Sequence, residues 1–194
     1  MLVSLVQSKI IMKTNVLTLS KTFPKWHPRA GEPTYFKEKI YNAGVLMSGP
    51  VDYKLPANSK DPNVIKLHTL RGNYNRWNKI FEQIYAGEAC LSLRVWSGKP
   101  YRSKMIEIAR LTEIDGIGLQ RLQFLPGPEG TMSDFRLSID WRLRNHDEAL
   151  ELAHAIAKND GLSFADWKDW MFGNCQDFRT PLAIIHFTSF RYGK

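Results

Sequence analysis

The feature that most constrains this chain is an alternation of apolar and polar residues near its middle. In residues 89–96, ACLSLRVW, every second side chain is apolar, and the turn residues SGKP lead at once into YRSKMIEIARL. A period of two around a short polar turn predicts a β-hairpin. Any fold for this chain must therefore contain antiparallel β-structure.

Further strands and helices are predicted on both sides of this hairpin. Strand patterns occupy residues 116–125, 134–142 and 181–192, and the last of these begins apolar on both faces, which predicts an interior strand. Apolar spacing and capping residues predict helices at residues 33–44, 73–87, 145–161 and 163–173. The predicted fold class is α+β, a mixed or antiparallel β-barrel with short peripheral helices, because closure of a sheet removes exposed edges.

Length and composition predict a single globular domain over residues 1–194. A chain of 194 residues can bury one core, and its 43% hydrophobic and 24% charged residues are typical of an ordinary globular protein. Residues 49–63 are rich in Pro, Asn and Asp and predict a surface loop. Two interpretations of residues 1–11 are left open. They are either an N-terminal extension, with the true start at Met12 and not at Met1, or an ordinary first strand.

Two distant cysteines, Cys90 and Cys175, predict neither a disulfide framework nor a zinc site and favour a reducing compartment. No apolar run has the length of a membrane span, and the apolar start of the chain is broken by Gln7, Ser8 and Lys9. These observations predict a cytoplasmic protein without a membrane partner. Its oligomeric state is left open.

The net charge of +8 is unevenly distributed along the chain. Residues 1–110 contain 18 Lys and Arg against 7 Asp and Glu, whereas residues 111–177 contain 6 against 12. Such an asymmetry is typical of a surface that faces a polyanion. A solvated basic face without a partner is the alternative.

Residues 64–71, VIKLHTLR, place several reactive side chains close together. On a regular strand Lys66 and His68 would share one face and Thr69 and Arg71 the other, so the lysine and the threonine could not cooperate. If the strand begins only near His68, Lys66 lies in the preceding loop and can approach Thr69. A desolvated amine beside a hydroxyl is an arrangement for an activated nucleophile. Solvated charges flanking an ordinary strand are the alternative.

The order of the elements and the segment KLHTLR resemble the ASCH superfamily, a branch of the PUA-like barrels. The family motif has a glycine, a lysine two residues on, a glutamate three further and an arginine two beyond. Lys66 and Arg71 match this motif, while Val64 and Thr69 depart from it. Threonine at this position is similar to the acetylcytidine amidohydrolase branch, in which a lysine, a threonine and an acidic residue before a short helix are the proposed catalytic set. Asp160 stands in a comparable place.

The resemblance covers about residues 16–192 and implies a PUA-like barrel with a cleft for RNA, a nucleotide or a modified nucleoside. It implies catalytic roles for Lys66, Thr69 and Asp160, with Arg71 and His68 facing the ligand. Because family members are often shorter, residues 45–62 and 112–150 are interpreted as insertions. Fold alone does not establish an activity.

Two other segments combine cations with aromatic rings, as nucleic-acid ligands require. The hairpin turn contributes Arg94, Trp96, Lys99, Tyr101 and Arg102. The segment PKWHPR holds Trp26 and His27 between two prolines that stiffen the loop, so it could line a cleft. For both segments, tryptophan packed into the protein with its charged neighbours in water is the alternative.

No metal or cofactor is predicted, since the five histidines are scattered and no nucleophile elbow or phosphate-binding loop occurs. Three hypotheses follow. The first is a basic cleft that binds RNA, a nucleotide or a modified nucleoside. The second is an amidohydrolase that acts on an acylated nucleoside such as acetylcytidine through Lys66, Thr69 and Asp160. The third is a protein-interaction domain.

Overall fold

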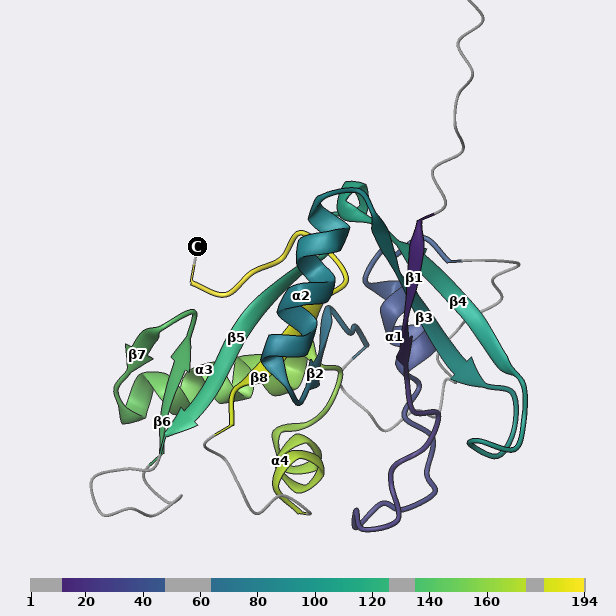
Figure 1. The fold of residues 1–194 in the computed structure, drawn as a ribbon. Helices are drawn as coiled ribbons and strands as arrows, with labels where there is room; N and C mark the ends of the chain where they lie inside the picture. The colour runs from purple at the N-terminus through teal and green to yellow at the C-terminus, as the bar shows by residue number, and fades with distance from the viewer. Residues whose placement is uncertain (1–11, 48–63, 126–134, 174–179, 194) are drawn as a thin grey trace, which may run out of the picture.

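The computed structural model describes residues 12–47, 64–125, 135–173 and 180–193, and Figure 1 shows how they are arranged. The predicted extension at residues 1–11 and most of the predicted loop and insertion at residues 45–63 lie outside the described residues. The described strands are β1 (Lys13–Thr18), β2 (His68–Arg71), β3 (Ala89–Trp96), β4 (Met105–Leu111), β5 (Gly118–Leu125), β6 (Arg136–Ile139), β7 (Arg142–Arg144) and β8 (Leu182–His186). The described helices are α1 (Phe36–Asn42), α2 (Tyr74–Tyr85), α3 (His146–Asn159) and α4 (Phe164–Phe172), with one 3-10 turn at Glu113–Asp115.

Side-chain caps set the starts of three helices where the sequence predicts them. The side chains of Asn73, Asn145 and Ser163 accept hydrogen bonds from backbone amides three residues later, at 2.9 to 3.1 Å. Each bond satisfies one of the amides that lack a partner in the first helical turn. The helix predicted at residues 33–44 is shorter than expected, because Pro33 pairs with Thr22 in a β-bridge and α1 begins only at Phe36.

The strands form two sheets instead of the predicted closed barrel. A three-stranded sheet has the order β1-β3-β4, with β1 parallel to β3, and an antiparallel five-stranded sheet has the order β2-β8-β5-β6-β7. Among the described strands no hydrogen-bonded pairing joins the two sheets. The edge strand β7 has only three residues, two of them arginines, and short charged edges resist unwanted pairing without closure. The coarse prediction of an α+β fold is confirmed.

The prediction of an interior strand within residues 181–192 is confirmed for β8, which pairs with β2 on one side and β5 on the other. The strand is shorter than predicted, because β8 spans only Leu182–His186. The range 112–150 supplies β5, β6 and β7, which make up most of the larger sheet. One prediction here is wrong. The strand predicted at residues 134–142 is not a single strand in its described part, residues 135–142, since a turn at Asp140 and Trp141 divides this part into β6 and the beginning of β7.

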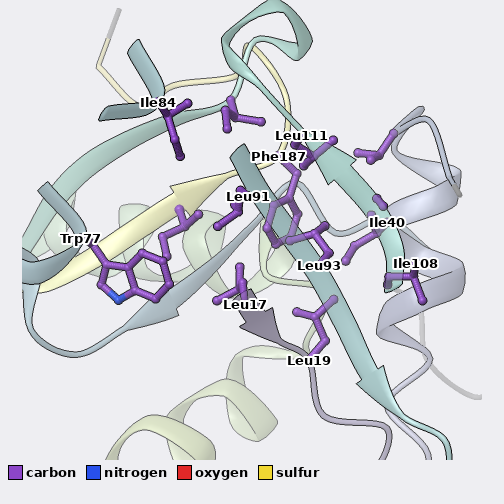
Figure 2. Packing of buried hydrophobic residues seen from close by; sticks show 14 of the residues in the cluster. Leu17, Leu19, Ile40, Trp77, Ile84, Leu91, Leu93, Ile108, Leu111 and Phe187 are labelled. Atoms are coloured by element: carbon purple, nitrogen blue, oxygen red, sulfur yellow. The ribbon is translucent and has the colours of Figure 1, made fainter. Parts of the chain in front are cut away.

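Two hydrophobic cores lie on opposite faces of the five-stranded sheet. The first core packs the three-stranded sheet and α2 against one face, and Figure 2 shows its side chains, among them Trp77 of α2 and Phe187 just after β8. The second core packs α3 and α4 against the other face. Side chains of β8 alternate between the two, with Ile185 in the first core and Ile184 in the second.

Candidate functional site: the Lys66 cavity

A cavity of about 620 Å³ opens beside β2, and we call it the Lys66 cavity. Its volume lies within the usual range for sites that bind small molecules. The wall is built from β2, the loop after β1, the β3–β4 turn, α1, α4 and the junction between α3 and α4. The residues that line it include Trp26, Phe36, Lys66, Thr69, Arg71, Trp96, Tyr101 and Asp160.

Lys66 lies in the loop before β2, because the strand begins only at His68. Its backbone amide donates to the carbonyl oxygen of Lys39 at the end of α1, at 3.0 Å, and the next amide, of Leu67, donates to Asn159 at 2.7 Å. These bonds turn the Lys66 side chain toward the end of α3. Lys66 and Thr69 consequently line the same cavity, as the loop arrangement requires.

The Lys66 ammonium forms a buried ion pair with the Asp160 carboxylate. Its Nζ atom donates to Asp160 Oδ1 and, at 2.6 Å, to the Asp160 carbonyl oxygen. Asp160 is the C-cap residue that directly follows α3, so both acceptors lie at the C-terminus of this helix. The next residue, Gly161, has a φ of +79°, and a Cβ atom there would lie 3.2 Å from Lys66 Cβ, so the junction depends on glycine.

Burial shifts the pKa values of both partners toward their neutral forms. It lowers the pKa of the Lys66 amine from 10.5 to about 8, although the nearby Asp160 carboxylate opposes this shift. It also raises the pKa of Asp160 above its usual value, against the influence of Lys66 and Arg71. Lys66 therefore gives up its proton more readily than an exposed lysine, which is a property of lysines that act as bases.

Arg71 joins the cavity wall to the end of β1. Its Nη2 atom donates to the Thr18 carbonyl oxygen at 2.5 Å, and Nη1 donates to the carbonyl oxygen of Leu70 at 3.2 Å. Burial lowers the pKa of Arg71, but a guanidinium remains charged in proteins. Arg71 thus presents a fixed positive charge at the cavity wall.

Aromatic side chains surround the more exposed part of the cavity. Trp26 is half exposed, and the rings of Trp96 and Tyr101 lie 5.3 Å apart between centroids. Tyr101 is 90% exposed and has a φ of 62°, in the left-handed region that favours glycine. Flat, accessible rings of this kind can stack on a nucleobase or another planar group.

Two histidines predicted to face the ligand do not line the cavity. His27 is buried, where Nε2 lies 3.0 Å from the Asp166 carbonyl oxygen and Nδ1 accepts from the Arg29 amide. His68 points to the face of β2 opposite Thr69, because strand side chains alternate, and its Nε2 lies 2.7 Å from the Tyr192 hydroxyl. Both histidines pack in the interior.

The hairpin predicted to bind a ligand contributes its aromatic rings to the cavity but not its cationic side chains. Its rings, Trp96 and Tyr101, line the Lys66 cavity, but Arg94, Lys99 and Arg102 do not. Arg94 donates to Ser92 at 2.9 Å and lies 3.7 Å from a Glu107 carboxylate oxygen, so a neighbouring acid already balances its charge. Lys99 and Arg102 are exposed at the turn.

Sequence reasoning missed Lys39, which is fully buried beside the ion pair. Its Nζ atom donates to the Gly161 carbonyl oxygen at 2.6 Å, and its charge also lowers the pKa of Lys66. The spacing could have revealed it, since Lys39 lies three residues after Phe36 and beside Ile40 on the apolar face of α1. Phe36 itself lines the cavity, with its ring centroid 4.0 Å from Lys66 Nζ.

In the described part of the chain, no His, Cys, Asp or Glu residues form a group of three that could hold a metal ion. Within the same residues, no helix is both long enough and apolar enough to cross a membrane. Comparison of the chain with protein-family models, with curated proteins and with solved structures finds no match in any of the three.

Proposed function

We propose that the Lys66 cavity binds a nucleoside or nucleotide unit, either free or as part of an RNA strand. The observation that carries this proposal is the meeting of accessible aromatic rings with fixed positive charge in one cavity. Trp26, Trp96 and Tyr101 offer faces for a base, and Arg71 offers a guanidinium for a phosphate. The resemblance to the ASCH superfamily and its PUA-like fold belongs to this proposal and points to the same ligands.

Titration calorimetry with cytidine monophosphate tests the binding proposal. The parent protein is expected to bind the nucleotide, and Trp26→Ala is expected to weaken binding roughly fivefold or more through lost stacking. Lys99→Gln is the control, because Lys99 lies on the β3–β4 hairpin that supplies Trp96 and Tyr101 but does not itself line the cavity. Affinity that is equal in the parent and the Trp26 variant, or no binding by the parent, would refute the proposal.

A second candidate function, hydrolysis of an acylated nucleoside, is favoured by the ion pair itself. Lys66, its pKa lowered by burial, lines the cavity with Asp160 and Thr69, as an activated nucleophile requires. In this mechanism neutral Lys66 removes a proton from the Thr69 hydroxyl or from water, and the oxygen attacks the acyl carbonyl carbon. The amide C–N bond then breaks, and the lysine proton passes to the leaving nitrogen. With Thr69 as nucleophile, water hydrolyses the acyl-threonine in a second round.

Chromatography of the products released from acetylcytidine tests the hydrolytic proposal. Lys66→Met is expected to abolish release of acetate, because no group of similar pKa replaces the amine. Thr69→Val removes the hydroxyl with little change of shape, while Thr69→Ser keeps it. Loss of activity in the valine variant alone would identify threonine as the nucleophile. Equal activity in both would identify water, and no turnover by the parent would leave binding as the function of the cavity.

A further inference from the structure

The turn between β6 and β7 has a conformation that its sequence does not favour. Ile139 pairs with Arg142, so Asp140 and Trp141 form a two-residue hairpin turn with φ values of 47° and 69°. Turns with two left-handed residues usually carry Asn-Gly or Asp-Gly, because glycine has no Cβ atom to clash. Aspartate is tolerated there, and here the Asp140 carboxylate accepts from the Arg121 amide and the Gln120 side chain, both at 2.8 Å. Tryptophan at the second position has no such explanation.

Packing does not explain the tryptophan either. Trp141 is 76% exposed, and the contact found for its ring is the Arg121 guanidinium, 3.7 Å from the ring centroid. A large apolar side chain in a left-handed conformation at a solvent-exposed turn gains little from burial. Backbone strain of this kind is concentrated at binding and switch sites.

The neighbourhood of Trp141 is rich in positive charge. Arg121 donates to Gln123 at 2.6 Å, while its Nη1 atom has no hydrogen-bond partner among the described residues. Arg142 and Arg144 of β7 line a second cavity, of about 800 Å³. β7 is the edge strand opposite β2 in the five-stranded sheet (Figure 1). Arg144 has no ion pair within the described part of the chain.

We infer that the Trp141 turn is a contact site for single-stranded nucleic acid. One base stacks on the outer face of the indole, whose inner face rests on Arg121, and the flanking phosphates contact Arg142 and Arg144. Guanidinium groups bind phosphates, and stacking on an aromatic ring accepts any base. Glu148 and Glu151 of α3 line the same cavity, so their charge confines the phosphates to the rim formed by β7.

This surface goes beyond the proposed function of the Lys66 cavity and does not depend on it. The two sites share no lining residue. A single nucleotide can occupy only one of them, whereas a strand supplies separate bases and phosphates. A mononucleotide and an oligonucleotide therefore distinguish the two proposals.

Fluorescence anisotropy with a labelled single-stranded RNA of about twelve nucleotides tests this inference on Trp141→Gly and Trp141→Phe. The glycine variant is expected to bind the strand roughly tenfold more weakly, whereas phenylalanine retains most of the affinity because it keeps a ring. The melting temperature of the glycine variant is expected to be no lower than that of the parent, since glycine adopts the left-handed conformation without strain. Weaker binding without loss of stability is not expected of a merely structural residue.

Equal affinity in the parent and Trp141→Gly would overturn the inference, and so would a parent that does not bind the strand. A lower melting temperature with unchanged affinity would assign Trp141 a packing role and would also overturn it. Cytidine monophosphate provides the control, because its binding to the Lys66 cavity is expected to be the same in the parent and in Trp141→Gly. Failure of the parent to bind this nucleotide while it still binds the strand would count against the cavity proposal alone.

Discussion

Lys66 and Asp160 are two charges that the fold removes almost completely from water. Their mutual attraction and the hydrogen bond to the Asp160 carbonyl oxygen offset a large loss of hydration. Removal of one partner leaves the other charge buried without compensation. Removal of both leaves no such charge. The pair is therefore coupled, and the effects of substitutions at the two positions are not additive.

A double-variant cycle measures this coupling. Lys66→Met and Asp160→Asn are each expected to lower the free energy of unfolding by about 3 kcal/mol or more, as expected when a buried ion pair is broken. The double variant is expected to lose less than the sum of the two, because neither charge remains. Urea denaturation of the four proteins gives the coupling energy, and additive losses would show that the two side chains do not interact.

The lowered pKa of Lys66 predicts how stability depends on pH. The amine has a pKa of about 8 in the folded protein and an ordinary value of 10.5 when unfolded. Between these values the unfolded chain binds more protons, so the free energy of unfolding rises with pH. The double variant has neither group. Relative to it, the free energy of unfolding of the parent is expected to rise by up to about 3 kcal/mol between pH 8 and 10.5. Urea denaturation at several pH values gives this difference, and a flat or falling difference would contradict the burial of Lys66.

At the scale of elements, the sequence predicts helices better than it predicts turns. A cap acts within four residues, and so Asn73, Asn145 and Ser163 could be recognised locally. The β6–β7 turn was missed because Trp141 occupies a position where a turn pattern would have glycine. A left-handed turn position cannot be recognised from residue preferences when it carries a residue, such as this tryptophan, that such turns rarely contain.

The cap of α2 provides a matched pair of variants. Asn73 has a φ of 58°, and its side chain accepts from the Arg76 amide at 3.1 Å. Asn73→Ala loses this bond and also strains the backbone, so the expected loss is about 1 to 2 kcal/mol. Asn73→Gly loses the bond but relaxes the backbone, and the expected loss is only a few tenths of a kcal/mol. Thermal denaturation ranks the two variants, and the opposite order would rule out a left-handed cap.

At the scale of the molecule, the sequence predicts which strands exist but not how they associate. Thr69 and Asp160 could be assigned to one site only through the family resemblance, because they lie 91 positions apart in the sequence. The burial of His27 and His68 depends on partners such as Asp166 and Tyr192, which no local pattern connects to them. The number of sheets likewise depends on which distant segments pair. The strands form two sheets, whereas a single closed sheet was predicted.

The sharing of β8 between the two cores predicts a single unfolding transition. Ile184 faces the second core and Ile185 the first, so neither core can come apart without exposing this strand. Ile184→Val and Ile185→Val are each expected to cost about 1 kcal/mol of global stability. Within each of the three proteins, circular dichroism and tryptophan fluorescence should report the same urea midpoint, and this midpoint should be lower in the two variants than in the parent. Separate midpoints for the two probes would show that the cores unfold independently.

The position of β8 in the sequence also bears on how the protein is made. β8 (Leu182–His186) follows every other described strand in the sequence, yet it lies between β2 and β5 in the larger sheet. During synthesis, β2 and β5 have left the ribosome before the strand that joins them exists. Until β8 has emerged, their inner edges are exposed to unwanted pairing. We therefore expect the nascent chain to need protection from aggregation until β8 has emerged, and to complete its larger sheet only after that point.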